Sequence, residues 1–136
     1  MAANSTATRL SWWFAVAAVL AALATVVHAF AGGSEIMDPL FASNNPLAST
    51  AVLDVVWQQV TALLLGSTVV IGAAAFRAEW RRPVAYLIGG HFAVIAAIFL
   101  VLGWKWFQSP WPMPQWIFFV PIVALLFLGV RRIQRT

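Results

Sequence analysis

Four long runs of apolar residues, separated by short polar or proline-rich stretches, dominate the chain. A transmembrane helix needs about 20 residues at a rise of about 1.5 Å per residue. The runs predict transmembrane helices over residues 10–31, 51–76, 84–103 and 115–130. Connections between them are short enough for neighbouring helices to run antiparallel. The predicted fold class is therefore an all-α membrane protein, an antiparallel four-transmembrane-helix bundle formed by one domain, residues 1–136.

The connections are predicted from glycine, proline and charged residues. Residues 32–50 are rich in Gly, Ser, Asn and Pro, and Asp38-Pro39 is a turn signal, so the longest loop is expected there. Residues 77–83 predict a short basic turn, with Pro83 in the first turn of the following helix. Residues 105–114 hold three prolines and cannot be regular helix throughout.

The first apolar run has a second interpretation, as a cleaved signal peptide. Ala29-Phe30-Ala31 has the small-x-small form of a cleavage site. Arg9, however, is the single basic residue before the run, and the run exceeds the usual length of about 7–15 residues. A retained helix is therefore favoured, with residues 1–9 disordered or lying at the membrane surface.

Composition supports a membrane protein. Hydrophobic residues make up 62% of the chain and charged residues 9%, whereas soluble domains are roughly a quarter charged. The net charge of +4 does not indicate nucleic-acid binding, because the basic residues lie at the ends of apolar runs. The chain has no cysteine, which excludes disulfides, thiolate metal sites and cysteine nucleophiles.

The basic residues also predict the orientation of the chain. All but Lys105 fall on one side of the predicted bundle: Arg9, Arg77, Arg81, Arg82, Arg131, Arg132 and Arg135. The positive-inside rule places that side, and with it both termini, in the cytoplasm. The expected location is the inner (cytoplasmic) membrane, which the chain crosses several times.

Two helix faces carry the polar residues that need an explanation in lipid. Three- and four-residue steps place on one face of the first helix Ala17, Ala21, Thr25, His28 and Gly32, and also Glu35 if the helix persists. The same steps join, on the second helix, Asp54, Gln58, Thr61, Leu65, Thr68 and Gly72. We expect these faces to meet. The outer mouth of the bundle would then hold a polar cluster of His28, Glu35, Asp54 and Gln58, with Lys105 near enough to neutralise a carboxylate.

This polar cluster has two interpretations. Its members satisfy one another and pin the helices together, or they bind a ligand or partner. His91, on the third helix, lies deeper in the membrane at the level of Ser67 and Thr68, which could hydrogen-bond it. It is either a buried histidine with a hydroxyl partner or a further ligand contact.

Several chemistries are disfavoured. A bis-histidine haem needs both imidazoles at one iron, but His28 is expected near the outer face and His91 in the inner half. Copper binding by His28, Met37 and Met113 lacks a supporting motif. No hydrolase or nucleotide-binding motif occurs. We therefore expect no cofactor, no metal and no catalytic residue. The enzymatic alternative is a membrane isomerase with His28 or Glu35 as acid or base.

A resemblance rests on His28 followed seven residues later by Glu35-Ile36-Met37, and on Trp57-Gln58 early in the second helix. This pattern resembles uncharacterised small four-helix bacterial membrane proteins, and it implies a four-helix fold. A more distant similarity is to the emopamil-binding four-helix group, which holds sterol-like ligands among carboxylates within the membrane. This chain lacks that group's deeper carboxylates.

The expected function is the binding of an apolar or amphipathic small ligand, or of a membrane partner, at the outer mouth. The ligand-binding residues would be His28, Glu35, Asp54, Gln58 and His91. One alternative is a structural or accessory subunit of a larger membrane complex, and another is an oligomeric small-molecule transporter. Expected partners are the lipid bilayer, a lipid-like molecule, and a second copy or another membrane protein, but no nucleic acid.

Overall fold

The computed structural model describes residues 10–133, without the side chains of residues 132 and 133. Its elements are α1 (Trp12–Val26), the π-helix η1 (Val27–Met37), α2 (Asp38–Ala42), α3 (Leu47–Phe76), α4 (Ala78–Phe107) and α5 (Trp116–Ile133). The first three form one continuous helix, Trp12–Ala42. Within residues 10–133 there is no strand, and the all-α prediction is confirmed. The expectations for residues 1–9 and for Arg135 lie outside the described residues.

Three helices are long and apolar enough to cross a membrane. They are Trp12–Ala42, Leu47–Phe76 and Ala78–Phe107, with 31, 30 and 30 residues. The last helix, α5, is apolar but shorter. The expectation of a membrane protein is thus supported by helix length as well as by composition.

The long loop expected over residues 32–50 is wrong, because only residues 43–46 connect the first two long helices. Gly32 and Gly33 lie inside η1 and do not end the helix. Pro39 stands in the first turn of α2, where its missing N–H and its fixed φ angle are tolerated. The next helix also begins earlier than expected, at Leu47, directly after Pro46.

The basic turn expected over residues 77–83 is a single extended residue, Arg77, with φ −120° and ψ 104°. The following helix starts at Ala78 and passes through Pro83, so the helix begins earlier than the proline suggested. At its other end this helix continues to Phe107, and it ends at Gln108 in the left-handed conformation, with φ 54°.

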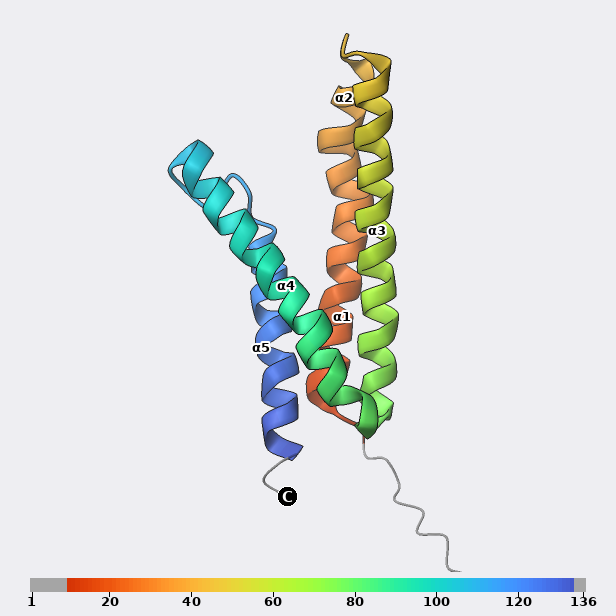
Figure 1. Ribbon diagram of the computed structural model, residues 1–136, viewed down its shortest axis with the longest axis vertical. Helices are drawn as coiled ribbons and strands as arrows, with labels where there is room; N and C mark the ends of the chain where they lie inside the picture. Colours follow the sequence, from red (N-terminus) through yellow and green to blue (C-terminus); the bar gives the residue numbers. More distant parts are fainter. Residues whose placement is uncertain (1–9, 134–136) are drawn as a thin grey trace, which may run out of the picture.

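The three long helices and the shorter α5 form two arms (Figure 1). The long arm consists of α1–η1–α2 packed against α3, and the short arm consists of α4 packed against α5. The arms join at one end of the molecule, here called the base, which contains the start of α1, the junction of α3 with α4, and the end of α5. Above the base the arms diverge, so the helices pack as four only over their lower part.

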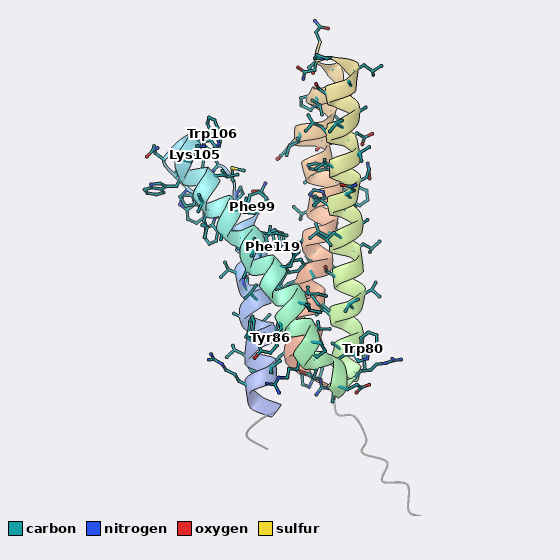
Figure 2. The ribbon with its side chains drawn as sticks, viewed as in Figure 1. Trp80, Tyr86, Phe99, Lys105, Trp106 and Phe119 are labelled. Carbon is teal, nitrogen blue, oxygen red and sulfur yellow. The ribbon has the colours of Figure 1, made fainter. Side chains whose placement is uncertain are left out.

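The core lies where the arms meet. Its largest fully buried side chains come from α1, α3, α4 and α5: Phe14, Ile71, Phe92, Ile122 and Leu126. Higher in the short arm, Phe119 stacks on Phe99 (Figure 2), with ring centroids 6.2 Å apart. Phe119 also meets Phe92 edge-on, with ring centroids 5.1 Å apart. These aromatic contacts continue the packing of α4 on α5 beyond the point where the long arm departs.

Hydrogen bonds join three helix ends at the base. The Ser11 backbone N–H donates to the Ala75 carbonyl oxygen at 2.9 Å and ties the start of α1 to the end of α3. The buried Arg81 guanidinium, from α4, donates to the carbonyl oxygens of Ala74 at 3.1 Å and Ala75 at 3.0 Å. A cation there also interacts favourably with the negative end of the α3 dipole.

Candidate functional site

Where α1 packs on α3, a threonine hydroxyl from each helix lies in the contact. Thr25 Oγ1 lies 3.4 Å from Thr68 Oγ1. Each also donates to a carbonyl four residues earlier in its own helix, Ala21 for Thr25 and Leu64 for Thr68. The two threonines come from the two faces that the sequence predicted to meet.

The face of α3 that is turned inward differs partly from the predicted one. Gln58 and Leu65 are exposed, whereas Trp57 and Leu64, one position earlier, are half-buried and buried. The inward positions follow alternating steps of three and four residues: Asp54, Trp57, Thr61, Leu64, Thr68, Ile71 and Ala75. The sequence interpretation followed the polar residues and therefore missed Trp57. Spacing alone would not have identified it, because the predicted face also alternates in steps of three and four residues and differs from the observed one only in phase.

Cysteines at positions 25 and 68 are expected to form a disulfide under mild oxidation. The two hydroxyl oxygens are only 3.4 Å apart, which is compatible with disulfide geometry, and the chain has no other cysteine. Mass spectrometry of non-reduced peptides would detect the bond. The matched control pairs Thr25→Cys with Leu65→Cys, whose parent side chain is exposed. Preferential cross-linking of the control pair would contradict this helix register.

The π-helix changes which side chains share a face. In η1 the backbone bonds reach five residues instead of four, so each residue turns less about the axis and the same face recurs after steps of four and five. His28 and Gly32 remain on the side toward α3, and the next residue there is Met37, which is buried. Glu35 is exposed. It does not continue the histidine face, as a regular α-helix would have required.

His28 packs against Trp57 of α3. The imidazole and indole rings are stacked, with centroids 4.0 Å apart and an interplanar angle of 18°. Gly32, one turn above His28, permits this arrangement, because a Cβ there would lie 2.9 Å from Trp57 Cη2. His28, Gly32 and Trp57 together form the candidate site.

The Nε2 atom of His28 is shielded from solvent and has no hydrogen-bond partner among the described residues. Trp57 contributes its ring and a backbone group within hydrogen-bonding reach of the imidazole, and its carbonyl oxygen is shared, because it also accepts from Thr61 Oγ1 at 3.0 Å. A shielded polar atom without a partner costs about 1–3 kcal/mol. Such atoms are few in native structures, so this nitrogen is a candidate contact for a binding molecule.

His28 does not lie at the end of its helix. It is sixteen residues after Trp12, which is about 24 Å at 1.5 Å per residue, on a helix of 31 residues. This position is near the middle of the helix and not at its outer end. The helix does not end near Ala31, as expected, but continues past Gly33.

The remaining members of the expected polar cluster do not join His28. The Gln58 amide donates to the carboxylate of Asp54, one turn earlier on α3, at 3.3 Å. Lys105 instead lies over the Trp106 ring at 5.1 Å, at the far end of α4 (Figure 2). Among the described residues neither Glu35 nor Lys105 forms an ion pair, so the expected charge neutralisation is absent from this part of the chain.

His91 is exposed on α4. The expected hydrogen bonds from Ser67 or Thr68 are not formed, because Thr68 bonds within the α1–α3 contact and Ser67 is buried on α3. The two histidines are thus in different settings, one packed within the long arm and one on the surface of the short arm. In the described part of the chain no three His, Asp or Glu side chains gather in a metal-binding arrangement.

Comparisons with protein-family models, with curated proteins and with solved structures find no match for this chain. The interpretation of the site therefore rests on its geometry alone.

Proposed function

We propose that this chain is a multi-pass protein of a bacterial inner (cytoplasmic) membrane, with four transmembrane helices and both termini in the cytoplasm, that binds a small apolar or amphipathic molecule at His28. The orientation is supported by the basic residues of the base, which include Arg77, Arg81 and Arg82. We also propose that the chain is similar to uncharacterised small four-helix bacterial membrane proteins.

The observation that carries the binding function is the shielded Nε2 atom of His28 without a partner. A polar atom within a membrane segment is costly unless it serves structure or function. The indole of Trp57 covers the imidazole, so rotation of this indole would open the site. A flat, mainly apolar molecule with one hydrogen-bonding group would replace the ring contact and supply the missing bond.

This proposal predicts that His28→Ala folds but loses most of its bound molecule. Loss of one hydrogen bond and one ring contact lowers affinity by about tenfold. The measurement is mass spectrometry of apolar compounds retained by the protein purified in mild detergent. His91→Ala is the matched control, because it removes the exposed histidine of the other arm. Equal retention by wild type and both variants would contradict the assignment of His28.

A second candidate function is that of an accessory subunit in a larger membrane complex. It is supported by the outward face of α3, where Gln59, Ala62 and Gly66 are all exposed and separated by three and four residues. A Cβ at Gly66 would meet nothing within 4 Å. Small residues and a glutamine amide are features of helix contacts in lipid. Gln59→Leu would then reduce co-purification with a partner chain and leave the His28 ligand unchanged.

A further inference from the structure

The base combines exposed basic and aromatic side chains from different helices. Arg77, Arg82 and Arg131 are exposed and form no ion pair among the described residues. Glu79 is the one described acidic residue at this end of the molecule. Because the start of α1, the α3–α4 junction and the end of α5 lie at the same end (Figure 1), these charges produce a local excess of positive potential.

Packing holds this surface in place. Ser11 and the buried Arg81 fix the α3–α4 junction through the carbonyl oxygens of Ala74 and Ala75. The adjacent Arg77 guanidinium lies over the Trp80 ring at 5.1 Å from its centroid, and Figure 2 places Trp80 at the base. Tryptophan prefers the headgroup level of a bilayer. A Trp80 ring at that level would hold Arg77 at the depth of the lipid phosphates.

We infer that the base binds the headgroup phosphate of an anionic phospholipid, with Arg77 and Arg82 as the principal contacts. Guanidinium groups match phosphate in charge and geometry, and basic clusters beside transmembrane helices attract anionic lipids. This inference does not depend on ligand binding at His28, which lies about 24 Å along the first helix from Trp12.

Thermal unfolding in an uncharged detergent tests the inference, with phosphatidylglycerol and phosphatidylcholine of equal chain length as probes. Phosphatidylglycerol is expected to stabilise the wild type at lower concentration than phosphatidylcholine. The double variant Arg77→Gln/Arg82→Gln should require about 30-fold more phosphatidylglycerol for the same shift. Inorganic phosphate should not reproduce the effect, because it lacks the acyl chains that place a headgroup at this depth.

Lys105→Gln provides the matched control, because Lys105 also lies over a tryptophan ring at 5.1 Å but at the opposite end of α4. It should keep the preference for phosphatidylglycerol. Equal stabilisation of the wild type by the two lipids would overturn the inference, and this comparison needs no variant. An equal loss of preference in Lys105→Gln, or full stabilisation by inorganic phosphate, would also overturn it.

Discussion

Phe14→Ala is expected to lower the free energy of unfolding by about 3–5 kcal/mol, the usual cost of removing a fully buried phenyl ring. Phe14 has no exposed surface and belongs to the core where α1 meets the other helices. Chemical denaturation in detergent, followed by circular dichroism, would measure the change. Val16→Ala is the control on the same helix, because Val16 is 46% exposed. A comparable loss in both variants would contradict the assigned core.

Gly129 provides a stricter test of the same contact. A Cβ there would lie 2.8 Å from Phe14 Cε2 and 3.0 Å from Trp13 Cβ, so Gly129→Ala alone should cost about 1–3 kcal/mol by overpacking. Combined with Phe14→Ala, the added methyl group enters the space left by the ring. The double variant should therefore lose less stability than the sum of the single variants. Additive losses would indicate that α1 and α5 are not in contact there.

Arg81→Met is expected to lower the free energy of unfolding by about 3 kcal/mol or more. Hydrogen bonds from a charged donor contribute about 1.5–3 kcal/mol each, and Arg81 donates to the carbonyl oxygens of Ala74 and Ala75. Methionine retains much of the apolar stem, so the loss reports mainly on the guanidinium. The same denaturation experiment in an uncharged detergent measures it.

Arg82→Met is the matched control for this prediction. Arg82 is adjacent to Arg81 in sequence but exposed, and surface substitutions usually change stability by less than about 0.5 kcal/mol. If the two variants lose the same stability, the base is not fixed by Arg81. A large loss confined to Arg81→Met would support its role in joining α3 to α4.

The apolar runs predicted the helices because length and hydropathy are properties of the sequence itself. Their ends were predicted less well. Residues 32–50 have a loop composition, but Pro39 occupies the first turn of α2, and Met37 is buried within the fold. Packing on a neighbouring helix can outweigh weak local propensity, and this contribution is not visible in one segment read alone.

The candidate site was predicted in part. The sequence identified His28 and the meeting of the two helix faces, as the contact between Thr25 and Thr68 shows. It assigned Glu35 to the histidine face because it assumed regular α-helical spacing. The π-helical hydrogen bonds of η1 change this spacing, and the close packing of Trp57 against Gly32 within η1 joins residues distant in sequence. The placement of Glu35 on a different helix face from His28 therefore could not be derived from the spacing of residues along this segment.

The most direct test of ligand binding at His28 is a ¹⁵N nuclear magnetic resonance spectrum of the histidine side chains in lipid nanodiscs. The chain has only two histidines, and His91→Ala assigns both. On addition of the apolar fraction of a bacterial membrane extract, the Nε2 resonance of His28 should shift toward a hydrogen-bonded position, while that of His91 should stay unchanged. An unchanged His28 resonance, or equal shifts of both histidines, would contradict the proposed function.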